Sequence, residues 1–149
     1  MKIALYQPDI PQNLGAMMRL CACMGTGLDI IEPCGFIWNE RKIRQSAMDY
    51  FDKINIMRHN NQNKFFDSYQ GQSRIILMTT KTDTPYYDFD FRDSDIILAG
   101  RESSGVPQDV HERVDSRICI PMTGDFRSLN IVNATSMILG EAIRQTRVI

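Results

Sequence analysis

The chain has 149 residues, of which 43% are hydrophobic and 23% are charged, and its formal net charge at pH 7 is −1. This length and balance are typical of one globular domain with a substantial core, and the near-zero charge excludes a surface that attracts polyanions everywhere. No apolar run approaches the roughly 18 residues that span a bilayer, and the N-terminus lacks a secretory leader pattern, so we expect a cytoplasmic protein with no membrane partner.

The cysteines and histidines show no metal-binding pattern. Cys21 and Cys23 would point to different faces of a helix, and no Cys-x-x-Cys spacing occurs. His59 and His111 are far apart, and neither belongs to a ligand motif. We therefore expect no metal and four reduced core thiols. These thiols are Cys21, Cys23, Cys34 and Cys119.

Short apolar runs that end at Pro, Gly or polar residues alternate along the chain with segments of helical periodicity. The runs predict strands at residues 3–6, 28–31, 54–57, 74–80, 96–99 and 117–120. The periodic segments predict helices at residues 13–24, 39–48, 63–69, 108–114 and 129–145. This alternation predicts an α/β fold: one domain over residues 1–149, with a mostly parallel sheet of about six strands and helices on both faces.

Several local features allow specific predictions. Asn13 is the expected N-cap of the first helix, and Gly25 is expected to end it. The basic residues of segment 39–48 form either a solvated helix face or an RNA contact. Segment 87–91 alternates aromatic and acidic residues, which predicts a brief edge strand or a loop pinned by its aromatic rings. The neighbouring aspartates argue against an RNA-stacking platform there.

Two predicted strands end in loops rich in Gly, Ser and Pro, where backbone groups are free to meet a ligand. Thr79, Gly100 and Ile120 all fall at the carboxyl ends of strands, where parallel sheets bind ligands, so we expect one shared pocket. The first strand is not followed by a Gly-x-Gly-x-x-Gly loop, and the chain has neither a Walker Gly-Lys-Ser/Thr nor a Gly-x-Ser-x-Gly elbow. Dinucleotide, ATP and serine-hydrolase sites are therefore disfavoured.

Three segments together resemble the motifs of the SpoU-type (SPOUT) RNA ribose 2′-O-methyltransferases, in order and over almost the whole chain. They are Pro11-x-Asn13-x-Gly15-x-x-x-Arg19, then Gly100-x-Glu102-x-x-Gly105-x-Pro107, then Ile120-Pro121-Met122 with Arg127-Ser128-Leu129-Asn130-x-x-Asn133-Ala134. The resemblance implies S-adenosylmethionine as the cofactor, a homodimer, and a deep trefoil knot in the C-terminal third. The knot is something that strand counting does not reveal.

The resemblance also implies a set of cofactor contacts. Taken singly, Met78 and Ile120 would be core residues in any α/β protein, and Gly100 would be a turn glycine. Their joint match to the motifs favours the cofactor role. The expected contacts are Met78, Thr79, Gly100, Ile120, Met122, Ser128 and Leu129.

Five residues are implied to serve catalysis. The family counterpart of Arg19 has been cast as the base, but a guanidinium has a pKa above about 12 and no acceptor. We favour Arg19 as a cation that orients the substrate phosphate and stabilises developing oxyanion charge, against the alternative of a surface arginine. Asn13 holds the active-site loop or contacts ribose, and Glu102 is a clamp for loop amides or for Arg19. Ser128 and Asn130 lie near the methyl donor, unless Asn130 only caps the last helix.

The minimal length and the stretch Ile31-Glu32-Pro33-x-Gly35-Phe36 resemble the subfamily that methylates the tRNA wobble ribose. This implies cytidine or modified uridine in an anticodon loop as the target. Arg101 and Ser104 depart from the usual second motif, so the inference of which RNA is methylated is weaker than the inference of the cofactor. The alternatives are another tRNA or rRNA position, and a non-catalytic RNA- or nucleotide-binding domain of the same fold. A flavodoxin-like module is a third, which lacks support because no phosphate loop follows the first strand.

Overall fold

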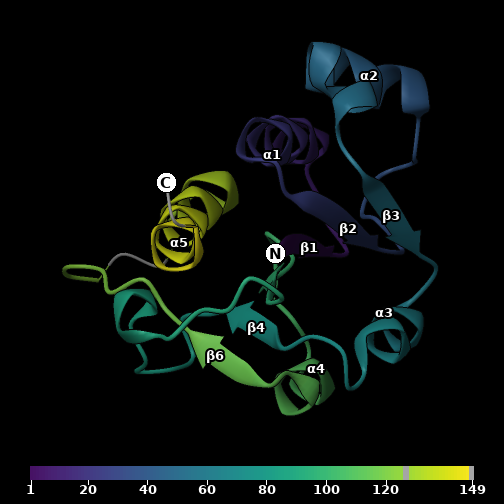
Figure 1. Ribbon diagram of the computed structural model, residues 1–149. Coiled ribbons are helices and arrows are strands. Elements are labelled where there is room, and N and C mark those ends of the chain that lie inside the picture. The colour runs from purple at the N-terminus through teal and green to yellow at the C-terminus, as the bar shows by residue number, and fades with distance from the viewer. Residues whose placement is uncertain (126–127, 148–149) are drawn as a thin grey trace.

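The computed structural model describes residues 1–125 and 128–147. Its centre is one six-stranded sheet in the order β3-β2-β1-β5-β4-β6, and every pairing is parallel (Figure 1). The strands are β1 (Lys2–Tyr6), β2 (Gly27–Ile31), β3 (Ile56–His59), β4 (Ile75–Met78), β5 (Ile96–Ala99) and β6 (Ser116–Ile118). The predicted parallel α/β sheet is confirmed.

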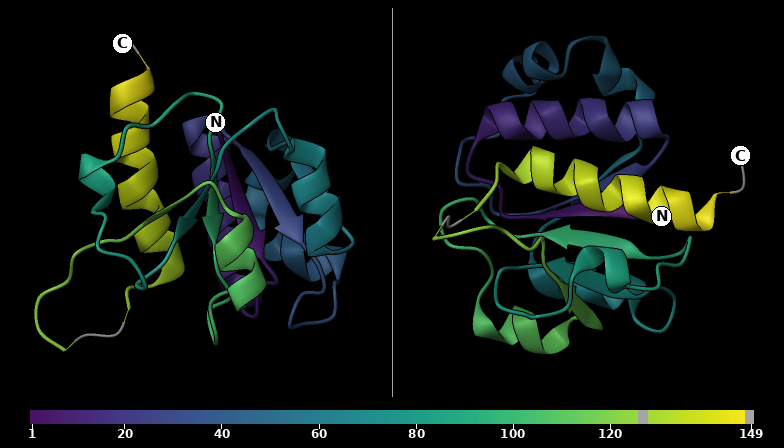
Figure 2. Two further views of the ribbon diagram at one scale, coloured as in Figure 1. Left: turned by 90° about the horizontal axis from the view of Figure 1, so that it is seen from below. Right: turned by 90° about the vertical axis from the view of Figure 1, so that its left-hand side faces the viewer.

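Helices cover both faces of this sheet, as predicted. Figure 1 shows α1 and α5 on one face and α3 and α4 on the other, with α2 lying outside α1. The helices are α1 (Pro11–Met24), α2 (Glu40–Ala47), α3 (Gln62–Tyr69), α4 (Gln108–Arg113) and α5 (Ile131–Thr146), and the short 3-10 turns are η1 (Met48–Lys53) and η2 (Tyr86–Asp88). Figure 2 shows α1 and α5 side by side along the sheet.

Each face of the sheet has its own apolar core, because alternate residues of a strand point to opposite faces. On one face, Leu14 of α1 and Leu139 of α5 pack against Ile3 and Ile97. On the other, Phe65 of α3 packs beneath the strands. Helix α5 turns one side toward this core. Its Ile138 and Ala142 are buried, and its Ile131 and Ala134 are half-buried.

The first helix begins earlier than predicted. Pro11 already occupies the first helical position, where its fixed φ is compatible with a helix. The N-cap is therefore Ile10, and the prediction of Asn13 as the cap is wrong. The stop is confirmed, since Gly25 adopts φ 64° and closes the helix with a left-handed residue. Asn13 lies within the first turn, where its side chain is free to bond elsewhere.

The glycine of the first motif has a packing role. Helix α2 crosses α1 so closely that a Cβ on Gly15 would lie 2.6 Å from the Ser46 Cβ and 2.9 Å from the Ser46 carbonyl carbon. Only a residue without a side chain fits this crossing. The same crossing carries η1 onto the outer side of α1.

Of the six strands only β5 has its predicted bounds, and β4 ends at Met78, two residues before its predicted end. Strand β3 starts two residues later than expected, because the η1 turn runs to Lys53 and leaves the next two residues to connect it. Strand β6 ends at Ile118, and Cys119 instead pairs with Pro85 through a single parallel bridge.

The 87–91 segment is a loop pinned by aromatic rings, one of its two predicted forms. Phe89 and Phe91 stack edge-on at 4.9 Å between ring centroids. The amide of Gln145 in α5 bonds the backbone on both sides, accepting from the Phe91 N–H at 2.9 Å and donating to the Phe89 carbonyl at 3.0 Å. The last helix therefore holds this loop in place.

All four cysteines carry free thiols. Cys21 is buried as predicted, and burial raises its pKa to about 11. Cys23 is exposed on α1, so its assignment to the core is wrong. None of the helices described is both long and apolar enough to cross a bilayer. The trefoil knot and the single-domain organisation over residues 1–149 stay predictions.

Candidate active site

A cavity of about 520 Å³ opens beyond the carboxyl ends of β4, β5 and β6. Its volume is in the range of small-molecule and cofactor sites. Residues of the loops after all three strands line it, together with the start of α1 and the first turns of α5. The predicted shared pocket is therefore present, and it is built from segments that span most of the chain.

The cavity gathers nearly all of the predicted site residues. Every predicted cofactor contact lines it, as do four of the five predicted catalytic residues. These are Asn13, Met78, Thr79, Gly100, Glu102, Ile120, Met122, Ser128, Leu129 and Asn130. Arg127 of the third motif lies outside the described residues.

The second motif folds into a tight turn that walls the cavity. Arg101 and Gly105 exchange two backbone hydrogen bonds, of 3.0 and 2.8 Å. Gly105 adopts φ 68°, a left-handed conformation that favours glycine. A Cβ on Gly100 would lie 3.0 Å from the Gly105 Cα, so the turn closes directly over that position. Both motif glycines are required by this geometry.

A chain of hydrogen bonds joins the three motifs at the cavity wall. The Glu102 carboxylate accepts from the Asp9 backbone N–H at 2.7 Å and from the Asn13 amide at 3.2 Å. Asn130 donates to the Asn13 oxygen at 3.2 Å. The Asn130 oxygen also caps α5 by accepting from the Val132 N–H at 2.9 Å. Glu102 thus clamps a loop amide as predicted, but its second donor is Asn13 and not Arg19.

A second cluster fixes the turn from outside. The Asp9 carboxylate accepts from the Arg101 Nε at 2.6 Å and from both the backbone and the hydroxyl of Ser103. Burial alone would raise the pKa of Asp9, but the hydrogen bonds from Ser103 and Arg101 outweigh it and hold that pKa below its ordinary value. Arg101, a departure from the usual motif, is therefore bound within the protein by the Asp9 carboxylate.

Arg19 is not brought to this cavity. It lies on α1 six residues after Asn13, which turns it about 120° around the helix axis. Its exposed guanidinium lies 5.3 Å from the centre of the Tyr50 ring on η1. Of the residues that the structure describes, Arg19 is the predicted catalytic residue that does not line the cavity.

His111 is a cavity residue that the sequence did not indicate. Its side chain on α4 is 6% exposed and lines the cavity wall. Burial, followed by the nearby charges of Lys81 and Arg117, lowers its pKa below the ordinary value, so the imidazole is neutral at pH 7. A lone histidine without a motif gives no sequence signal of this position.

Residues 1–125 and 128–147 contain no cluster of three or more His, Cys, Asp or Glu side chains that could hold a metal ion.

A parallel α/β sheet, with a ligand cavity built from Gly-rich loops at the carboxyl ends of three strands, defines the class of nucleotide- and cofactor-binding α/β proteins. Within that class, the model of the SpoU rRNA methylase family matches residues 1–140, and the chain belongs to this family. The match includes all three motif segments.

Curated relatives are similar over nearly their full length. A protein of Beijerinckia indica named tRNA (cytidine(34)-2′-O)-methyltransferase is 50% identical over 145 residues, covering 96% of this chain and 90% of that protein. An Escherichia coli K12 protein of the same name is 36% identical over 147 residues, covering 97% and 93%.

Solved structures share the fold. One described as "Structural insights into the 2-OH methylation of C/U34 on tRNA" superimposes with a TM-score of 0.90 at 34% identity, covering 97% of this chain and 94% of that one. The AviRb SpoU methyltransferase of Streptomyces viridochromogenes, in complex with AdoMet, superimposes with a TM-score of 0.87 at 24% identity and covers 97% and 60%. At that identity the second likeness concerns the fold alone.

Proposed function

We propose that the protein transfers a methyl group from S-adenosylmethionine to the ribose 2′-hydroxyl of the wobble nucleotide of tRNA, either cytidine or modified uridine. The observation that carries this proposal is the single cavity into which the fold brings the three motif segments. The relative that is 50% identical and is named for this reaction supports the choice of substrate. A tRNA substrate also favours the predicted cytoplasmic location.

The cavity suits the proposed cofactor. The side chains of Met78, Ile120 and Leu129 offer an apolar slot for an adenine ring, and the glycine turn beside them presents backbone N–H and C=O groups. When bound, S-adenosylmethionine supplies a methyl group that its sulfonium already activates. The protein then has to align the ribose oxygen with that methyl group and accommodate one released proton.

We assign roles to the polar wall on this basis. Ser128 and Asn130 line the cavity just before α5, and their proposed role is to contact the methyl donor and the ribose. Glu102 holds Asn13 and the loop at Asp9 in place and acts as a clamp, because both of its bonded partners donate to its carboxylate. In the transfer, the ribose oxygen forms a bond to the methyl carbon as the carbon–sulfur bond breaks, and the 2′-hydroxyl proton leaves through a substrate phosphate or water.

Arg19 fits this scheme if the protein is a homodimer. It lies outside its own cavity on the exposed side of α1, so a second copy is needed to bring it to a site. Small and apolar side chains on α1 and α5 support that packing. They are Ala16, Ser136 and Met137, and Met137 is 42% exposed. We propose that Arg19 of one copy orients the substrate phosphate at the other copy's cavity.

Labelled methyl transfer from S-adenosylmethionine to total tRNA, followed by nucleoside mapping, tests the function. We expect label in a wobble 2′-O-methyl nucleoside for the wild type and none for Arg19→Ala. Label at another ribose would keep the chemistry and correct the substrate. Cofactor binding without label in tRNA or ribosomal RNA would instead indicate a non-catalytic domain of this fold.

Mixed variants test the exchange between copies. Arg19→Ala and Gly100→Ala should each be inactive alone, the second because its new methyl group meets the Gly105 backbone. If Arg19 acts across the dimer, co-refolding the two variants creates a species with one intact site and restores part of the activity. A mixture that stays inactive, or a wild-type protein that sediments as a monomer, would contradict this arrangement.

A further inference from the structure

The loop that follows β2 packs against the outer wall of the active site. We name residues 33–38 the rim loop. The Gly35 N–H donates to the Pro8 carbonyl at 2.9 Å. A Cβ on Gly35 would collide with the Asp9 carboxylate and lie 3.1 Å from an Arg101 Nη atom. The rim loop is therefore in direct contact with the residues that fix the second-motif turn, one step from the cavity.

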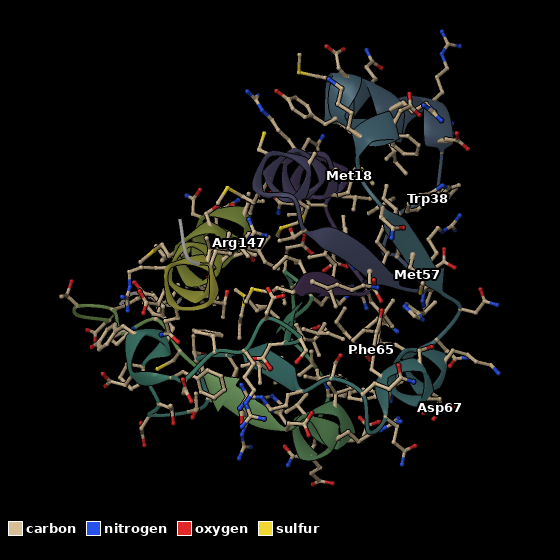
Figure 3. All side chains as sticks on the ribbon, viewed as in Figure 1. Met18, Trp38, Met57, Phe65, Asp67 and Arg147 are labelled. Carbon is tan, nitrogen blue, oxygen red and sulfur yellow. The ribbon has the colours of Figure 1, made fainter. Side chains whose placement is uncertain are left out.

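The rim loop holds one apolar side chain out in solvent. Ile37 is 92% exposed. Its neighbours Phe36 and Trp38 pack against the core of the α1 face. The Trp38 ring is further covered by the Arg58 guanidinium, 3.9 Å from the ring centre, and Arg58 in turn pairs with Glu32. Figure 3 shows Trp38 at this edge of the sheet, near Met57 of β3.

A singly exposed apolar residue is ordinary on a protein surface and by itself indicates nothing. Ile37 differs because anchored residues on both sides fix its position and because its loop adjoins the active site. Core packing does not account for Ile37, since its side chain is almost fully exposed.

The surface next to Ile37 carries available positive charge. Arg41 and Lys42 follow Glu40 in the first turn of α2, four and five residues after Ile37, and both are exposed. Neither has a carboxylate partner within 4 Å in the part of the chain that the structure describes, whereas Arg44 on the same helix is paired with Glu40. An exposed apolar side chain beside unpaired cations is complementary to a ligand that has both flat apolar base faces and negatively charged phosphates.

We propose that the rim loop is an RNA-contact surface, on which Ile37 packs against the face of an unstacked base beside the target nucleotide while Arg41 and Lys42 contact the adjoining phosphates. This inference rests on the proposed function. Single-stranded loops are recognised by packing side chains against splayed bases, and cations on the flanks neutralise the backbone. Apolar side chains, isoleucine among them, also pack between bases in nucleic-acid complexes.

The chain offers a built-in reporter for this contact, because Trp38 is its one tryptophan and is adjacent to Ile37. Titration of the wild type with a tRNA that it methylates, and with the isolated anticodon stem-loop, should change Trp38 emission with a saturating dependence on RNA. Ile37→Asn should raise the Kd and KM for RNA by about 5-fold, the lower end of the range for loss of a base–aromatic stack, and leave kcat nearly unchanged. Calorimetric binding of S-adenosylmethionine should stay the same.

Two further variants sharpen the test. Met48→Ala removes another exposed apolar side chain, 62% exposed on η1, and should leave RNA affinity unchanged. The double variant Arg41→Gln/Lys42→Gln should weaken binding and reduce the slope of log K against log salt by about 2 if both residues contact phosphates.

Several results would overturn the proposal. One is that Ile37→Asn binds RNA as tightly as the wild type and that Trp38 emission does not change on RNA binding. Another is that Ile37→Asn sediments as a monomer while the wild type is a dimer, which would show that the loop contacts a second copy of the chain. A wild type that binds cofactor but methylates no RNA would instead refute the proposed function, which a failure at Ile37 alone would not touch.

Discussion

Whether Gly15→Ala stabilises or destabilises the protein depends on one contact at the α1–α2 crossing. Gly15→Ala adds a methyl group at a position where the Ser46 Cβ lies 2.6 Å away and the Ser46 carbonyl oxygen 2.9 Å away. Two of the three close atoms are backbone, so the new group cannot be relieved by a side-chain rotation. The two helices have to separate, and overpacking of this kind typically costs about 1–3 kcal/mol.

Helix propensity acts in the opposite direction. Replacing glycine by alanine inside a helix is favourable by about 1 kcal/mol when nothing is in the way. Gly140 in α5 is the matched control, because a Cβ there meets no atom within 4 Å. We therefore expect Gly140→Ala to stabilise the protein and Gly15→Ala to destabilise it or leave it near the wild type, with a difference of about 1–3 kcal/mol between the two variants.

Urea unfolding followed by circular dichroism measures this difference, at a concentration where both variants have the same mass in solution. In thermal unfolding each kcal/mol corresponds to about 2–4 °C for a chain of this size. Equal stability of Gly15→Ala and Gly140→Ala would show that the crossing has room for a methyl group, and the packing account of the motif glycine would be refuted.

Three other changes probe the polar groups. Glu102→Ala removes the acceptor of two hydrogen bonds, one to Asn13, so we expect a loss of about 1.5–3 kcal/mol in unfolding free energy; an unchanged urea midpoint would contradict the clamp. His111 has a folded-state pKa below its unfolded value of about 6.5, so the unfolded chain binds the proton more readily and stability falls as pH drops below 6.5. His111→Leu should remove this part of the dependence between pH 7.5 and 5.5, and parallel curves for both proteins would refute it. Asp95→Asn leaves the Arg74 guanidinium without the fully buried carboxylate that it contacts at 2.7 and 2.9 Å, and we expect a loss of about 2–3 kcal/mol, less than for a fully buried pair because Arg74 is 26% exposed. A double-mutant cycle with Arg74→Met checks the assignment, since a coupling energy near zero would separate the two residues.

Local sequence patterns predicted the bounds of an element correctly where only one pattern of secondary structure fitted the residues. Residues 96–99 form an apolar run between an aspartate and a glycine, and β5 has those bounds. At the start of α1, two rules competed. Asn13 is a good N-cap residue, but Pro11 is a better first helical residue, and proline decided the boundary because its φ is fixed by the ring. Strand β3 begins two residues after the start of its apolar run because η1 ends at Lys53 and residues 54 and 55 connect the two elements.

The site was predictable to the extent that it lies at strand ends. Residues beyond β4, β5 and β6 had to meet at one edge of a parallel sheet, and they line one cavity. The Asp9–Arg101 pair joins residues 92 positions apart and leaves no local pattern. Whether Arg19 faces the cavity depends on how α1 is rotated about its axis against the sheet. The spacing of the motif does not specify that rotation. His111 enters the wall only through the packing of α4.

The hydrogen bond between Asn13 and Asn130 bridges 117 residues. During synthesis the ribosome releases the chain from its N-terminus, so Asn13 and Glu102 emerge well before the first turn of α5. A nascent chain can form β1 and α1 early, but the cavity lacks its last wall until α5 has left the exit tunnel and docked. The protein thus gains its ability to hold a ligand only after α5 has docked, although residues of the other walls have been synthesised before it.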